Sequence, residues 1–133
     1  MKKIEHIGIA VKNLEASNLL FEKLLGRKHY KIEEVASEGV KTSFFKAGPN
    51  KIELLEATNP ESPIAKFIAK KGEGVHHIAF AVDNIEAEIK RLQKEGFTII
   101  NTTAKKGADN KLVAFLHPKS TNGVLVELCQ EIK

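Results

Sequence analysis

Two stretches of the chain share one pattern of apolar and polar positions. Residues 5–11, EHIGIAV, and residues 76–82, HHIAFAV, each place a histidine before a short, mostly β-branched apolar run. Such a run is typical of a buried strand. The shared pattern aligns His6 with His77, which indicates that the second half of the chain repeats the first.

Each of these strands leads into a segment with helical periodicity. Residues 14–25 and 85–95 carry apolar side chains at spacings of three and four, which predicts a helix with one buried side. Gly26 and Gly96 follow at the positions where helices end in a left-handed cap. The two halves therefore share their second predicted element as well.

Three strand candidates follow each predicted helix, separated by turn-forming residues such as GPN and TNG. They lie at about 28–36, 39–47, 50–56, 97–102, 111–117 and 122–129. Between the halves, residues 62–71 predict a helical connector, with Ser62 as its N-cap and Pro63 in its first turn. Each half thus reads as a βαβββ module.

The pattern predicts an α+β protein with one domain, 1–133, made of two tandem modules at about 1–60 and 72–133. Its composition, 42% hydrophobic and 29% charged, is that of a globular protein with a buried core. No apolar run approaches the roughly 20 residues needed to span a bilayer, so we expect no membrane association. The single cysteine, Cys129, excludes an intramolecular disulfide and fits a reducing cytoplasm.

The net charge of +4 changes this picture little. The lysines are scattered among many glutamates, and the aromatic fraction is 6% with no tryptophan. Few side chains are therefore available to stack on bases, and we expect no nucleic-acid partner. The positive charge can still attract an anionic small-molecule substrate into a cleft.

A second pair of matching positions lies near the end of each half. Residues 50–57, NKIELLEA, align with residues 123–130, GVLVELCQ, so that Glu53 matches Glu127. Strand alternation turns each glutamate away from its apolar neighbours, to the other face of the sheet. A carboxylate in the concavity of a curved sheet is costly unless it is paired or bound to a metal.

If the modules are related by pseudo-symmetry, their equivalent residues face each other. His6, Glu53, His77 and Glu127 would then form one mixed nitrogen and oxygen site. Such a site suits a divalent first-row ion such as Co, Ni, Zn or Mn. Four ligands leave coordination positions open on an octahedral ion, which a catalytic site requires.

Four further residues have side chains that could bind a metal or react, but a structural role explains each of them better. His76 is expected on the opposite face from His77, because only the latter aligns with the first half. His29 is expected at the surface, and His117 in a turn. Cys129 is expected to be a small buried residue on the face of the nearby glutamate, since no basic neighbour in sequence would activate its thiol.

These motifs resemble the vicinal oxygen chelate (glyoxalase/bleomycin-resistance) superfamily, and within it the methylmalonyl-CoA epimerases. The similarity covers nearly the whole chain, including EHIGIAVKNLEAS, SPIAKFIAKKGEGVHHIAFAVDNI and LHPKSTNGVLVEL. It implies a curved, barrel-like mixed sheet with helices outside, and a homodimer. It also implies that the four metal ligands are His6, Glu53, His77 and Glu127.

The resemblance implies a metal-dependent isomerase that interconverts methylmalonyl-CoA epimers. A proton next to the thioester would be abstracted through a metal-stabilised enolate, with one group on each face of the carbon. Glu127 is the expected acid/base, with Glu53 or a metal-bound water as the second. Some epimerases carry a glutamate where this chain has Thr42, which cannot act unaided as a base at neutral pH.

Two alternatives remain open from the sequence. Glyoxalase I, a lactoylglutathione lyase acting on a glutathione hemithioacetal, has the same ligand order. It commonly has a D-P-D-G-type turn before its last ligand, whereas residues 117–123, HPKSTNG, are similar to the epimerases. The other alternative is a non-catalytic member that binds a metal or small molecule, whose mark would be a missing ligand.

Overall fold

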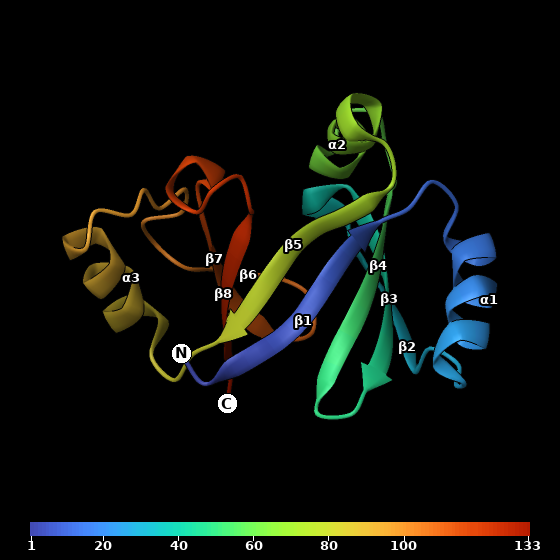
Figure 1. Ribbon diagram of the computed structural model, residues 1–133, viewed down its shortest axis with the longest axis horizontal. Helices are drawn as coiled ribbons and strands as arrows, with labels where there is room; N and C mark the ends of the chain where they lie inside the picture. The colour runs from blue at the N-terminus through green and yellow to red at the C-terminus, as the bar shows by residue number, and fades with distance from the viewer. The chain divides into compact units, whose positions relative to one another are not determined.

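The computed structural model describes all residues, Met1–Lys133 (Figure 1). The chain forms two compact units, which we call the N-terminal unit, His6–His76, and the C-terminal unit, Met1–Glu5 with His77–Lys133. The divisions between them fall inside the first strand, β1 (Lys3–Ala10), and the fifth, β5 (Gly74–Ala81). Each unit is described in turn.

The N-terminal unit contains the first βαβββ module and the connecting helix. Its strands follow the spatial order β2-β3-β4-β1, in which β1 runs parallel to β4 and the other pairs are antiparallel. The elements after β1 are α1 (Leu14–Leu25), β2 (Lys31–Val35), the 3-10 turn η1 (Ala36–Glu38), β3 (Val40–Ala47), β4 (Asn50–Ala57) and α2 (Pro63–Lys71).

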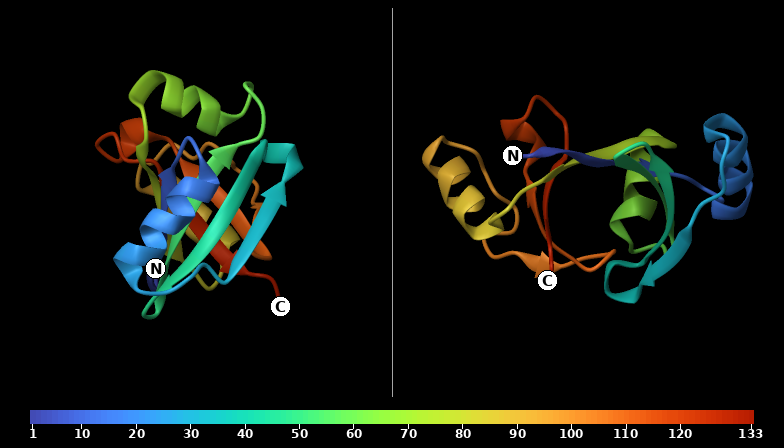
Figure 2. Two further views of the ribbon diagram at one scale, coloured as in Figure 1. Left: turned by 90° about the vertical axis from the view of Figure 1, so that its right-hand side faces the viewer. Right: turned by 90° about the horizontal axis from the view of Figure 1, so that it is seen from below.

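Helix α1 begins and ends where the sequence predicts. The Asn13 side chain accepts a hydrogen bond from the Ala16 N–H at 2.9 Å, and Gly26 ends the helix at φ 74°. The inner side of α1 packs on Phe45 and Leu54, which belong to one face of the curved sheet. Helix α1 therefore lies outside the curve of this sheet (Figure 2).

Helix α2 confirms the predicted connector. The Ser62 hydroxyl caps it by accepting from the Ile64 and Ala65 N–H groups, and Pro63 occupies the first turn. Ile64 packs with Leu55 at the end of β4. Because Leu54 faces α1 and Leu55 faces α2, the two helices contact opposite faces of the N-terminal sheet.

The C-terminal unit contains the second βαβββ module, and its strands follow the order β5-β8-β7-β6. As in the first module, the first and last strands pair in parallel and the rest are antiparallel. The elements after β5 are α3 (Ile85–Lys94), β6 (Lys105–Lys106), β7 (Lys111–Leu116), the 3-10 turn η2 (Pro118–Ser120) and β8 (Val126–Glu131). The expected α+β class with two βαβββ modules is confirmed.

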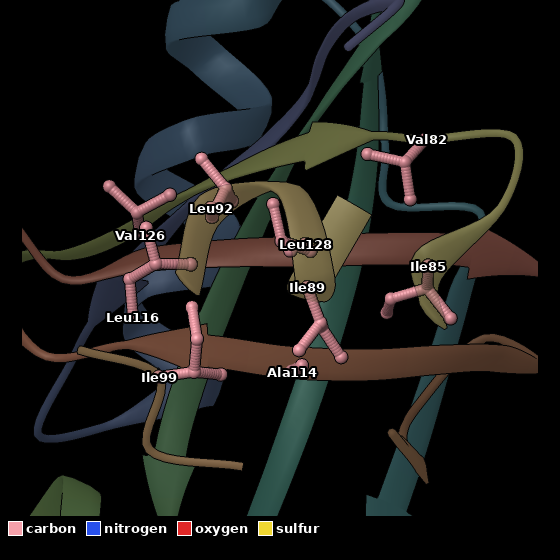
Figure 3. Close-up of a cluster of buried hydrophobic side chains, with 9 residues drawn as sticks. All are labelled: Val82, Ile85, Ile89, Leu92, Ile99, Ala114, Leu116, Val126 and Leu128. Carbon is pink, nitrogen blue, oxygen red and sulfur yellow. The ribbon is translucent and has the colours of Figure 1, made fainter. Parts of the chain in front are cut away.

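The core of the C-terminal unit lies between α3 and its sheet (Figure 3). Ile85, Ile89 and Leu92 are spaced along one side of α3 and point toward the sheet. They pack on Leu128 of β8 and on neighbouring apolar residues of β7. Full burial of such a side chain contributes about 1.5–3 kcal/mol, so this cluster fixes α3 against the outer face of the sheet.

One predicted strand is wrong. Residues 97–102 form no strand, and only Ile99 makes an isolated bridge. The Asn101 side chain accepts the hydrogen bond from the Phe115 N–H at 3.0 Å, taking the place of a backbone carbonyl. The ladder therefore stops here, and the two-residue β6 pairs with β7 instead.

None of the three helices is long and apolar enough to cross a membrane.

Candidate functional site

The N-terminal unit brings His6 and Glu53 together on the face of its sheet opposite α1. Parallel pairing sets Gly8 of β1 beside Glu53 of β4, so His6 lies on the same face two residues earlier. His6 Nδ1 is 3.1 Å from Glu53 Oε2. Both residues are buried, at 5% and 6% exposure.

The C-terminal unit repeats this arrangement with His77 and Glu127. Here Ala79 of β5 pairs with Glu127 of β8, and His77 again precedes the small residue by two positions. His77 Nε2 is 3.1 Å from Glu127 Oε1, and both residues are as buried as their counterparts. The ring of Phe115 meets the His77 ring edge-on, with centroids 6.0 Å apart.

The chemistry of each pair is that of a metal half-site. A buried carboxylate needs a charged partner or an ion to offset its lost hydration. A neutral imidazole and a carboxylate together offer one nitrogen and one oxygen donor, which first-row divalent ions accept. Two protein ligands are fewer than a protein metal site uses, so each pair is suited to supply half of a coordination sphere.

The same face of the N-terminal sheet continues onto β3 and β2. In register, Phe44 lies beside Glu53, while Thr42 lies between Leu55 and Glu33. Thr42 is almost fully buried at 1% exposure. Thr42 therefore lies on the same sheet face as Glu53, and its hydroxyl cannot act unaided as a base at neutral pH.

The remaining histidines and the cysteine are placed as follows. Cys129 is buried against Ala79 and Val113, on the same sheet face as Glu127, as expected. His117 is exposed, and its Nδ1 accepts from the Lys119 N–H beside the 3-10 turn, which confirms the turn position. His76 contacts the Phe67 ring edge-on at 4.9 Å.

The surface position predicted for His29 is wrong. The residue is only partly exposed, and its ring meets Phe45 edge-on with centroids 5.9 Å apart. The chain turns back after α1 and lays the imidazole beside the aromatic core under that helix. The local sequence RKHY contains no apolar periodicity that would have predicted this contact.

Two buried charges were missed by the sequence analysis. Glu5 and Lys111, at 6% and 8% exposure, line a cleft of about 450 Å³ within the C-terminal unit. Lys111 Nζ lies 3.5 Å from Asp109 Oδ2, which offsets part of the cost of burying the ammonium. Alternation in KLVAFL could have placed Lys111 on the face of Val113, but nothing in the sequence predicted burial of its charge.

Comparison with known proteins gives a consistent result. Residues 5–115 match the model of the Glyoxalase/Bleomycin resistance protein/Dioxygenase superfamily. An ethylmalonyl-CoA/methylmalonyl-CoA epimerase of Cereibacter sphaeroides is 38% identical over 96% of this chain and 97% of its own length. An uncharacterized protein of Bacillus subtilis is also 38% identical, over 98% and 93% of the two chains.

Solved structures agree with these relatives. A single-substitution variant of the methylmalonyl-CoA epimerase of Streptomyces coelicolor, in complex with 2-nitronate-propionyl-CoA, superposes with a TM-score of 0.94 at 32% identity. The match covers 98% of this chain and 95% of that structure.

Proposed function

Because this chain belongs to the glyoxalase/bleomycin resistance protein/dioxygenase superfamily and is an isomerase of the epimerase type, we propose that it interconverts the two epimers of methylmalonyl-CoA. The substrate is the one named for the related epimerases. The observation that carries the proposal is the pair of buried histidine–glutamate contacts at repeat-equivalent positions, each 3.1 Å long.

We also propose that His6, Glu53, His77 and Glu127 hold one divalent ion, chosen from Co, Ni, Zn and Mn. Three features of the residues support this set. The donors are nitrogen and oxygen atoms of the kind such ions take, all four residues are buried, and the internal repeat pairs them two by two. When bound, the ion supplies a Lewis acid that draws charge from the thioester carbonyl.

The residues themselves would move the proton. Epimerisation removes the proton next to the thioester from one face of the carbon and returns one to the other face. We propose that Glu127 serves one face, since a buried carboxylate beside His77 is held in place and sheltered from water. Glu53 is the corresponding candidate in the N-terminal unit.

The test is an exchange assay with each epimer of methylmalonyl-CoA in deuterated water, in the presence of divalent cobalt. We expect deuterium at C2 together with interconversion of the epimers. A protein that shows no exchange but turns over a glutathione hemithioacetal would be a lactoylglutathione lyase instead. The relatives named as epimerases favour the first outcome.

The metal site has a separate test. His77→Ala removes one nitrogen donor from the proposed set, and we expect the purified variant to lose bound cobalt in equilibrium dialysis. His117→Ala is the matched control, because that imidazole is exposed and caps a turn. If His77→Ala bound cobalt as tightly as the unaltered protein, the proposed ligand set would be wrong.

A homodimer and a cytoplasmic location complete the proposal, and both rest on the family resemblance. Light scattering on the purified protein tests the first, with a molar mass twice that of the chain as the expected result. A mass equal to one chain at working concentration would contradict the homodimer and leave the chemistry above intact.

A further inference from the structure

The reaction proposed above needs two proton-transfer groups, and the N-terminal unit offers one that is outside the metal ligand set. The inner face of its sheet, opposite α1, carries only two carboxylates on its strands, Glu53 and Glu33. Glu53 is engaged with His6 and is 8% exposed in its side chain. Glu33 is 35% exposed, so a substrate can reach it.

Strand register gives the placement of Glu33. It lies beside Thr42 of β3, which in turn lies beside Leu55 of β4, two positions beyond Glu53. Neighbouring strands are about 4.8 Å apart, so two spacings put roughly 10 Å between the backbones of β2 and β4. Glu33 and Glu53 therefore lie on the same face of the N-terminal sheet, two strands and two residues apart.

The neighbours of Glu33 hold its carboxylate over this face. Lys31 Nζ lies 3.6 Å from Glu33 Oε1 and 4.7 Å from the centre of the Phe44 ring. The lysine therefore lies over the Phe44 ring of β3 and stays partly exposed to solvent. Phe44 is the register partner of both Lys31 and Glu53, so it links the two carboxylate-bearing strands.

We propose that Glu33 is the second acid/base of this reaction. This inference rests on the proposed function. Thr42 on β3 offers no base, and Glu33, its neighbour on β2, carries out the proton transfer instead. Glu53 can then remain a metal ligand. One carboxylate takes the proton from its face, and the other group, present as the carboxylic acid, delivers a different proton to the opposite face. The two groups then exchange protons with solvent, so no further reactant is needed.

Glu33→Gln is the decisive variant, because it keeps the size and removes the base. Glu34→Gln is its matched control, since Glu34 is the next residue, is exposed and points to the other face of β2. We expect interconversion to fall by about 10²–10⁴-fold in Glu33→Gln and to stay unchanged in Glu34→Gln. Glu33→Asp, which retains a shorter carboxylate, should recover part of the rate.

Deuterium exchange separates catalysis from a structural role. With Glu33 removed, Glu127 can still take and return the proton on its own face. We therefore expect Glu33→Gln to exchange the C2 proton of one epimer with solvent while failing to invert it. A general loss of folding would remove both activities, and circular dichroism and urea titration would detect it.

Two outcomes would overturn the inference in different ways. If the unaltered protein interconverts the epimers and Glu33→Gln does so at the same rate, Glu33 is not the second group and the proposed function stands. If the unaltered protein neither exchanges nor interconverts methylmalonyl-CoA, the proposed function fails and this inference falls with it.

Discussion

On the inner faces of the two sheets, side chains that lie beside one another across neighbouring strands form rows. One such row is alike in the two units, and the next row along the strands differs. In register, the inner face of each sheet carries a small residue, a glutamate and a phenylalanine across three strands. These are Gly8, Glu53 and Phe44 in the N-terminal unit, and Ala79, Glu127 and Phe115 in the C-terminal unit. The row that supports the histidine–glutamate contact is therefore the same in both halves.

The next row along the strands has diverged at its outer end. It reads Ala10, Leu55, Thr42 and Glu33 in the N-terminal unit, and Ala81, Cys129, Val113 and Lys105 in the C-terminal unit. One half ends its row in a carboxylate and the other in an ammonium group. The repeat therefore keeps the histidine–glutamate contact in both halves, while the side chains around that contact differ.

The largest effects should come from breaking the shared row. We expect Glu53→Ala and Glu127→Ala each to release the bound metal, and Glu127→Ala, which also removes the proposed base, to lower interconversion by at least about 10²–10⁴-fold. Metal content by atomic emission and the deuterium assay measure the two losses. Glu56→Ala is the control, since Glu56 lies on the other face of β4.

Deuterium exchange at C2 without inversion should then distinguish the role of Glu127 from that of Glu53. If Glu127 transfers the proton, Glu127→Gln loses exchange at its face even when excess cobalt restores metal binding, whereas Glu53→Gln recovers exchange under the same conditions. Equal recovery of both variants would contradict the assignment of Glu127 as the base.

Core substitutions compare how firmly each unit is packed. Ile89→Ala in α3 and Leu54→Ala in β4 each empty a buried position, at 2% and 0% exposure, and we expect each to lower the free energy of unfolding by about 2–5 kcal/mol. Urea titration followed by circular dichroism measures it. Leu24→Ala, at a position 70% exposed, should change stability by less than about 0.5 kcal/mol.

The helix caps should be equivalent. Asn13 and Asn84 cap α1 and α3 in the same way, accepting from the Ala16 and Ala87 N–H groups at 2.9 and 3.0 Å. We expect Asn13→Ala and Asn84→Ala each to cost about 0.5–2 kcal/mol, with Asn→Asp variants near the original stability. Thermal melts compare the four variants, and a loss at one cap only would break the equivalence.

The smallest effect concerns a charged pair present on α3 alone. Arg91 Nε donates to Glu88 Oε1, while the matching positions on α1 hold Ser17 and Leu20. The hydrogen bond from Arg91 lowers the pKa of the Glu88 carboxyl. A carboxyl with a lower pKa in the folded state stabilises the fold above its unfolded pKa, and this contribution is lost as the pH falls through the folded pKa.

The Glu88 effect can be followed by urea midpoints across the acidic range. Because Arg91 is mostly exposed, we expect Glu88→Gln to cost only about 0.2–1 kcal/mol near neutral pH. The difference from the unaltered protein should disappear as the pH falls through the folded pKa of Glu88. A difference that grew with acidity would have the wrong sign for this pair.

Much of the fold could be predicted because the repeat supplied two independent copies of each pattern. The predicted helix at 14–25 matches α1, and the predicted helix at 85–95 matches α3 within one residue. The same repeat selected His77 over His76 and matched Glu53 with Glu127, residues that lie in two equivalent contacts. Their role in holding a metal stays a prediction.

The errors came from contacts that act across strands. Residues 97–102 have the composition of a strand, but the Asn101 side chain replaces a ladder bond and ends the pairing. His29 is partly buried because an aromatic ring from β3 lies beside it. The place of Glu33 on the inner face depends on which strand pairs with which, and alternation in KIEEV alone leaves the face undecided.

The division of β1 between the two units has a consequence for how the protein is made. Lys2 belongs with the second half of the sequence, since its N–H donates to the Ala81 carbonyl at 2.9 Å and its ammonium lies 3.1 Å from Asp83. On the ribosome, about 80 residues must be added before these partners exist, which takes roughly 4–16 seconds. The first residues to be synthesised are thus among the last to reach their partners, and the second half of the sequence does not contain the whole of the C-terminal unit.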